Sequence, residues 1–282
     1  MGAASYFSAD YAEARRKFLS VAETAGAQLS TFVNDAVKGP AGEELACDVA
    51  RFGPTDASRV LLMTSATHGV EGFCGSGAQV GLLAQGWHRK LPKDTALVLA
   101  HALNPHGFAW LRRVNEDNVD LNRNFIDHSK PHPVNAPYRE VHPLLIPADW
   151  DGPARAAADA QVQKYIAERG QKAWQAAVSA GQHDHDDGLF YGGRKATWSN
   201  RTLREIVRRH LGHAKRIAFL DMHTGLGPSG YGEPIYVGSA TPEGYREAVA
   251  WYGEQVTDLN AGVFPGTPDE NDRTRAVLRE FV

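Results

Sequence analysis

The chain has 282 residues, of which 43% are hydrophobic and 22% are charged, and its formal net charge is −3. This composition is that of an ordinary globular protein, and the length allows one large hydrophobic core. We therefore expect a single α/β domain over residues 1–282. The small net charge gives no electrostatic reason to expect nucleic acid or a membrane surface as a partner, so we expect neither.

Charged residues such as Arg15 and Lys17 interrupt the apolar pattern of residues 1–30. This segment therefore lacks the continuous apolar core of a signal peptide, and no apolar run approaches membrane-spanning length. We expect a cytoplasmic protein. Cys47 and Cys74 lie in apolar neighbourhoods and form no C-x-x-C pair, so we expect buried thiols and no metal held by sulfur.

The first half of the chain has the pattern of a βαβ unit. Apolar residues at helical spacing predict a helix within residues 8–27, and alternation predicts two strands joined by a Gly-Pro turn. Two short apolar runs then suit strands buried on both faces, with a helix between them. The predicted strands are Leu29–Val33, Leu45–Phe52, Arg59–Thr64 and Thr95–Ala100, and the helix between the last two is Gly75–Gln85.

The second half begins with residues 127–150, which are rich in Pro and His and predict a long irregular loop at the rim of a site. Helical composition returns afterwards, and a buried strand and an edge strand follow. The predicted helices are 153–180, 199–211 and 242–257, the strands are Arg216–Asp221 and Pro234–Val237, and residues 260–275 are expected to be exposed.

Two histidines and a glutamate follow predicted buried strands: His68 and Glu71 come after the first, and His223 comes after the last. In an open α/β sheet, ligands bind beyond the carboxyl ends of the strands. Either histidine alone is better explained as a hydrogen-bonded residue near a strand end. Together with a carboxylate they favour a metal. Two nitrogens and one oxygen suit one catalytic zinc ion with a place left for water, although iron, cobalt and manganese also accept this set.

The segment Asp120–Phe125, with the sequence D-L-N-R-N-F, is too polar for a simple connector. The guanidinium of Arg123 can clamp a carboxylate with two hydrogen bonds, and Asn122 can add a neutral donor. Arg113 can polarise a carbonyl or stabilise an oxyanion, although a solvated surface is the plainer explanation for this arginine. The turn Asn104–Phe108 is expected to be structural at its proline and glycine.

Four fragments occur in a fixed order: H-x-x-E, N-P-x-G-F, D-L-N-R-N-F and D-x-H-T-G. This order resembles the zinc carboxypeptidase-like metallopeptidase superfamily. It looks most like an uncharacterised bacterial branch that also resembles succinylglutamate desuccinylases and aspartoacylases. The resemblance extends from about Phe7 to Tyr252. It implies a three-layer α/β/α fold around a mixed, mostly parallel eight-stranded sheet.

The same resemblance assigns roles to individual residues. It implies that one zinc ion is held by His68, Glu71 and His223, that a terminal carboxylate is bound by Asn122 and Arg123, and that an oxyanion is stabilised by Arg113, or by Arg112 if the register shifts by one residue. Tyr191, in the fragment G-L-F-Y-G-G, is a candidate pocket residue. An aromatic side chain in a loop is more often a packing residue, and that alternative stays open.

The mechanism of these relatives also needs a glutamate from a late strand, which moves a proton from water to the leaving nitrogen. Glu280 lies 57 residues after His223 and is the candidate base, although the residues before it look helical. The alternative is that the chain is truncated or diverged at its end. In that case a final strand, a helix and the base itself are missing.

The leading hypothesis is a zinc-dependent hydrolase that cleaves an amide bond next to a carboxylate, with a small peptide as substrate. An N-acyl amino acid deacylase of the desuccinylase or aspartoacylase type uses the same residues on an N-acyl amino acid. A zinc-binding pseudoenzyme without the glutamate is the alternative from another class. A serine hydrolase is disfavoured, because Gly75–Gly77 does not form the G-x-S-x-G elbow. The sequence makes no prediction of the oligomeric state.

Overall fold

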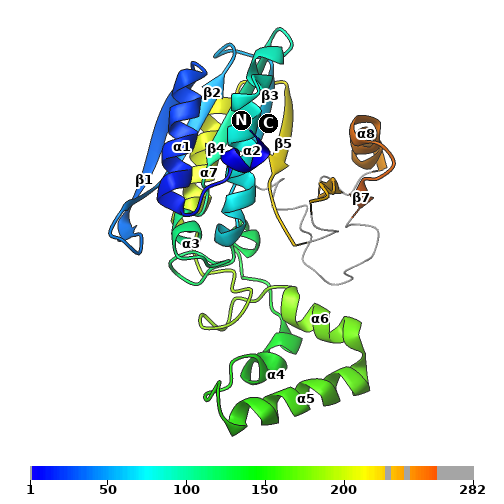
Figure 1. Cartoon of the computed structure of the whole chain (residues 1–282). Coiled ribbons are helices and arrows are strands. Elements are labelled where there is room, and N and C mark those ends of the chain that lie inside the picture. The colour runs from blue at the N-terminus through cyan, green and yellow to red at the C-terminus, as the bar shows by residue number, and fades with distance from the viewer. Residues whose placement is uncertain (1, 226–229, 238–241, 259–282) are drawn as a thin grey trace. The chain divides into compact units, whose positions relative to one another are not determined.

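The computed structural model describes residues 2–225, 230–237 and 242–258 (Figure 1). The chain divides into two compact units, and each is described by itself. Among the described residues, the first unit contains 2–116 and 197–225, and the second contains 117–196, 230–237 and 242–258. The organisation of the chain as a single domain stays a prediction.

The first unit is built on a mixed sheet with the strand order β1-β2-β4-β3-β5. β3 runs parallel to both β4 and β5, whereas β2 is antiparallel to both β1 and β4. The expected α/β fold with a mixed sheet is therefore confirmed. The described part of this sheet has five strands, joined by two antiparallel and two parallel pairings. An eight-stranded, mostly parallel sheet therefore stays a prediction. The strands are β1 (Gln28–Lys38), β2 (Glu44–Phe52), β3 (Arg59–Thr64), β4 (Thr95–His101) and β5 (Arg216–Asp221).

Helices lie on both faces of this sheet, with α1 and α2 on one face and α7 on the other (Figure 1). Side chains alternate between the faces of a strand, and Leu97 and Leu99 of β4 pack in one cluster with Phe18 of α1 and Val80 of α2. On the opposite face, the guanidinium of Arg209 in α7 lies over a β1 aromatic ring. The helical elements are η1 (Ala3–Tyr6), α1 (Tyr11–Thr24), η2 (Gly69–Glu71), α2 (Gly72–Ala84), η3 (Trp87–Lys90), α3 (Pro105–Ala109) and α7 (Trp198–Leu211).

Two of these helices begin at side chains that satisfy their first amide groups. The N–H of Glu13 donates to the carboxylate of Asp10 at the start of α1 (2.7 Å), and the N–H of Asn200 donates to the hydroxyl of Thr197 at the start of α7 (3.2 Å). Each cap contributes about 1 kcal/mol to helix stability. The predicted helices 8–27 and 199–211 therefore have well-defined starting points.

The second unit is mainly helical. Val141, Tyr165 and Ala177 bring together three helices, α4, α5 and α6, in one small core. The predicted helix 153–180 is two helices, because the chain takes a positive φ of 87° at Gly170. The elements are η4 (Leu121–Arg123), α4 (Ala136–Leu145), α5 (Pro153–Arg169), α6 (Gln171–Ser179), β6 (Ile235–Tyr236), α8 (Pro242–Tyr252) and β7 (Thr257–Asp258).

Helix α4 lies in the segment 127–150, where an irregular loop was predicted, and this prediction is wrong for residues 136–145. The helix begins at Asn135, whose side chain accepts a hydrogen bond from the N–H of Tyr138 (3.1 Å). Its buried stripe consists of Tyr138 and Val141 alone, and Pro143 lies inside it. A stripe of two residues is too short to give a helical period, so the pattern went unrecognised.

Among residues 2–225, 230–237 and 242–258, no helix is both long and apolar enough to cross a membrane.

Candidate metal centre

The candidate site lies in the first unit, where two neighbouring parallel strands end together. Thr64, the last residue of β3, is paired in register with Asp221, the last residue of β5. His68 follows β3 by four residues and His223 follows β5 by two, so both histidines leave the same edge of the sheet. The sequence reasoning that placed them at strand ends therefore agrees with the topology.

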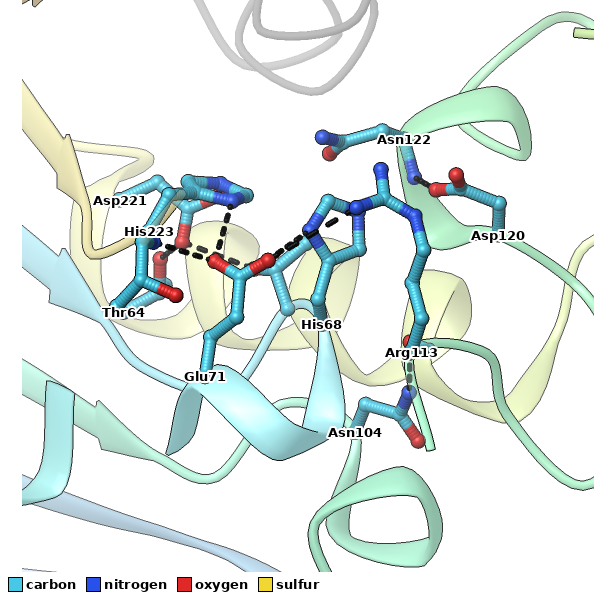
Figure 2. Close-up of polar contacts among 11 residues, drawn as sticks. Thr64, His68, Glu71, Asn104, Arg113, Asp120, Asn122, Asp221 and His223 are labelled. Atoms are coloured by element: carbon cyan, nitrogen blue, oxygen red, sulfur yellow. Dashed lines mark hydrogen bonds and ion pairs between the residues drawn. The ribbon is translucent and has the colours of Figure 1, made fainter. Parts of the chain in front are cut away.

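Glu71 lies between the two imidazoles (Figure 2). Its Oε1 is 3.0 Å from Nδ1 of His68, and its Oε2 is 3.4 Å from Nδ1 of His223. The two rings meet edge to face with their centroids 4.9 Å apart. One ligand atom from each of the three residues lies within 4.8 Å of the others, so small side-chain rotations bring all three within about 2 Å of a single ion. The residues that the sequence proposed as metal ligands are thus brought together, and their donor set fits zinc.

Asp221 contacts the ring nitrogen of His223 that does not face Glu71. Its Oδ2 lies 2.6 Å from Nε2 of His223, and its Oδ1 accepts hydrogen bonds from the hydroxyls of Thr64 (2.5 Å) and Thr67 (2.8 Å). A carboxylate on one nitrogen fixes the tautomer of a histidine and leaves the other nitrogen available to a metal. Sequence reasoning missed this support, although the spacings T-x-x-T-H and D-x-H carried a signal for it.

Two carboxylates lie against the imidazole of His223. Burial lowers the pKa of His223, but the charge and hydrogen bond of Asp221 and the contact with Glu71 outweigh it and raise the pKa to about 10. Burial raises the pKa of Glu71, yet hydrogen bonds with His223, His68 and the N–H of Thr224 hold it well below its ordinary value. Two carboxylates therefore face one imidazolium, and a divalent cation can take the place of its proton.

We expect Asp221→Asn to weaken zinc binding at this triad by about 10- to 100-fold, the usual cost of losing a carboxylate behind a ligating histidine. The amide keeps the size of the side chain but loses the charge that makes His223 a strong ligand. Competition with a chelating dye measures the dissociation constant. Asp35→Asn, at an exposed position of β1, is the matched control. Equal zinc affinity in the two variants would remove the supporting role of Asp221.

Two glycines allow the turn that carries His68 and Glu71. A Cβ on Gly69 would lie 1.9 Å from the carbonyl carbon of Gly107, and one on Gly72 would lie 2.6 Å from the ring of Phe108. Close approach of neighbouring groups explains both glycines, and neither has a positive φ. η2 is thus pressed against α3, which sets the position of the triad.

Gly69→Ala should destabilise the protein by about 3 kcal/mol, because the added methyl group overlaps a backbone carbonyl that has little room to move. Denaturant unfolding measures the change in the free energy of unfolding. Gly232→Ala is the control, since a Cβ there meets nothing within 4 Å. A Gly69→Ala protein as stable as this control would contradict the tight packing of η2.

Arg113 is held beside the triad by its backbone. Its carbonyl accepts hydrogen bonds from the N–H of Gly69 (3.3 Å) and from the side-chain amide of Asn104 (3.4 Å), which is fully buried. Its Nη1 lies 3.8 Å from Oε1 of Glu71, and 43% of its side chain is exposed. The N-P-x-G-F fragment is therefore a structural support that places a partly exposed guanidinium beside the candidate ligands.

The D-L-N-R-N-F fragment belongs to the second unit, and its buried residues flank two that are more exposed. Asp120 is fully buried and accepts a hydrogen bond from the N–H of Asn122 (2.9 Å; Figure 2). Asn124, also buried, donates to the carbonyls of Gly192 and Lys195 (both 2.9 Å). Asn122 and Arg123 are only half-buried. The fragment thus builds a turn on which these two side chains are presented.

Arg123 makes contacts within its own unit. Its Nη2 donates to the carbonyl of Ser179 (2.5 Å), and its guanidinium lies 5.6 Å from the ring centre of Phe190. Tyr191 is 6% exposed. The carboxylate-binding roles of Asn122 and Arg123 and the pocket role of Tyr191 stay predictions. Glu280 lies outside the described residues.

Solved structures share this fold. Carboxypeptidase A from Helicoverpa armigera superposes with a TM-score of 0.54 at 15% identity, over 95% of this chain and 61% of that one. Bovine thrombin-activatable fibrinolysis inhibitor, solved in complex with tick carboxypeptidase inhibitor, gives a TM-score of 0.52 at 12% identity, over 96% of this chain and 83% of that one. The chain thus spans less than two thirds of the insect protein's length. At these identities the likeness concerns the fold: the chain has a carboxypeptidase-like fold.

No curated protein has a sequence that matches this chain significantly. One family model does match, over residues 7–280, and its description reads "Protein of unknown function (DUF2817)". This match covers almost the whole chain, including both histidines and the glutamate of the triad. The protein therefore belongs to the DUF2817 family.

Proposed function

We propose that this protein is a zinc-dependent hydrolase that cleaves an amide bond next to a carboxylate. The observation that carries the proposal is the convergence of His68, Glu71 and His223 at the carboxyl ends of β3 and β5, in a carboxypeptidase-like fold. A zinc ion held by these residues supplies a Lewis acid for a carbonyl and lowers the pKa of water to about 7.

The chain's own side chains then have separate tasks. Arg113 polarises the scissile carbonyl and stabilises the oxyanion, a role supported by its partly exposed guanidinium 3.8 Å from Glu71. Asn122 and Arg123 fix the substrate carboxylate, and Tyr191 lines the pocket. Glu280 accepts a proton from water and passes it to the leaving nitrogen. The substrate is a small peptide or an N-acyl amino acid.

A substrate panel tests the proposal. The zinc-loaded full chain is incubated with dipeptides, muropeptide-like peptides and N-acyl amino acids, each paired with a version whose carboxylate is amidated. We expect the free acids to be hydrolysed with a much higher kcat/KM than their amidated versions, and we expect this activity to be lost after chelation and to return with zinc. Cleavage of N-acyl amino acids but not peptides would assign the deacylase activity. Stoichiometric zinc without any turnover would contradict hydrolysis and leave a zinc-binding pseudoenzyme.

Arg123→Ala should raise the KM for a carboxylate substrate by about 10- to 100-fold, because a charge-assisted pair worth about 1.5–3 kcal/mol is lost. The amidated analogue separates this role from the packing of Arg123 against Phe190, since a folding defect affects both substrates equally. Arg194→Ala, at an exposed position of the same unit, is the control. An unchanged ratio of the two KM values would remove the clamp role.

A further inference from the structure

A second group of metal-binding side chains lies in the second unit, and the sequence reasoning did not identify it. His142 comes from α4, whereas His185 and Asp187 come from the segment 181–193, called here the histidine loop. One ligand atom from each lies within 4.8 Å of the others. Nε2 of His142 is 3.4 Å from Oδ1 of Asp187, and the two imidazoles are stacked with their centres 3.8 Å apart.

Buried polar side chains hold the histidine loop in shape. Gln182 is 1% exposed, and its Oε1 accepts hydrogen bonds from the N–H groups of Asp184 (2.9 Å) and His185 (2.8 Å). The N–H of Gly188 donates to the carbonyl of His185 (3.1 Å), which closes a turn around Asp187. The positions of the two loop ligands are therefore set by the fold.

Helix α4 is tied to the same loop. The side-chain amide of Asn135, at the start of the helix, donates to the carbonyls of Ala177 (3.0 Å) and Gly181 (2.9 Å). Tyr138, one turn before His142, and Val141, next to it, are both fully buried. The helix is thus anchored at the first residue of the histidine loop, and His142 is held on the side of the loop ligands.

The carboxylate of Asp187 is the one that faces this group. Arg139 binds Asp184 (2.7 Å), whereas the ion pair of Asp187 is with His142. Nδ1 of His142 is buried and has no hydrogen-bond partner among the described residues.

We propose that His142, His185 and Asp187 bind one divalent transition-metal ion, with zinc as the favoured ion, and that this ion clips α4 to the histidine loop. Two imidazoles and a carboxylate suit zinc, copper or nickel, whereas magnesium and calcium prefer all-oxygen sites. The planes of the His142 and His185 rings are inclined by only 21°. An ion lies in the plane of each imidazole that binds it, so an ion shared by both rings needs a wider angle between the two planes. Binding therefore turns the His185 ring away from its stack. This site is independent of the proposed hydrolase activity.

The test uses a variant that lacks the His68 and His223 ligands, so that only zinc at His142, His185 and Asp187 is counted. The full chain carrying His68→Ala and His223→Ala is stripped with a chelator and titrated with zinc in a calorimeter. We expect one zinc ion per chain with a dissociation constant in the micromolar range or tighter, and no binding of magnesium. Adding His142→Ala, His185→Ala or Asp187→Ala should weaken this binding at least about tenfold.

Two controls keep the result specific. Asp187 and Asp186 are neighbouring exposed residues, so Asp187→Ala removes a ligand without a core defect, and Asp186→Ala should leave zinc binding unchanged. His128→Ala tests a separate imidazole pair, in which Nδ1 of His128 lies 3.1 Å from Nε2 of His132. The proposal is overturned if no zinc binds, if Asp187→Ala and His185→Ala bind it normally, or if His128→Ala abolishes binding.

Zinc should also protect His142 and His185 from diethyl pyrocarbonate, a reagent that modifies free imidazole nitrogens. Mass spectrometry of the modified peptides measures this protection, and the measurement does not depend on enzyme activity. His213, which is exposed, is the internal control and should be modified equally with and without zinc. Equal modification of all three histidines in both conditions would contradict a site at the histidine loop.

Discussion

Replacing His68 or His223 by alanine is expected to remove one zinc ion per chain and to lower kcat/KM by about a thousandfold or more. Polarisation of a carbonyl by a metal ion is worth several kcal/mol, and each 1.36 kcal/mol is a factor of ten in rate. Glu71 and the one remaining histidine do not retain the ion, because two protein ligands leave the shell incomplete. Metal analysis and steady-state kinetics on the purified variants measure both effects.

The zinc count needs a background in which only one centre can bind. We therefore place each substitution in the Asp187→Ala chain, where the histidine loop has lost a ligand, and expect the count to fall from one ion to none. His213→Ala replaces an exposed histidine of the same unit and should keep both zinc and activity. Full zinc occupancy in the His68→Ala and His223→Ala variants would refute the assignment of the ligands.

The triad could be predicted because its positions follow from sheet geometry. Buried strands are apolar along their whole length, so the sequence shows where β3 and β5 end. Parallel neighbours present their carboxyl ends at one edge, and the pairing of Thr64 with Asp221 brings His68 and His223 to it. The mixed sheet was expected from the resemblance alone, because strand direction depends on pairings between distant segments.

Contacts between distant segments were less accessible. The hydrogen bonds from Thr64 and Thr67 to Asp221 join residues more than 150 positions apart, so the T-x-x-T-H spacing does not by itself reveal that Asp221 is the partner. The need for a glycine at position 69 was also inaccessible, because the residue that leaves no space for a side chain there is Gly107, in a later turn. His142 went unnoticed because its helix has only a two-residue buried stripe, and its partners lie more than forty residues later.

Glu280→Gln should leave zinc binding unchanged and lower kcat by about 10²- to 10⁴-fold, the usual contribution of a positioned proton acceptor. The amide keeps the size of the side chain but accepts no proton, so an effect on kcat with metal retained separates proton transfer from metal binding. The family match reaches this residue, whose structure lies outside the described part. Glu254→Gln, at an exposed position, is the control.

The outcome for Glu280 also decides which group transfers the proton. If the wild-type chain hydrolyses its substrate and Glu280→Gln does so at the same rate, another group transfers the proton, and the assignment of Glu280 is wrong. If kcat falls while the KM for the free acid stays constant, the carboxylate clamp and the base act at different steps, as the proposed division of tasks requires. The pH dependence of kcat should then lose its acidic limb in Glu280→Gln, because that limb reports protonation of the base.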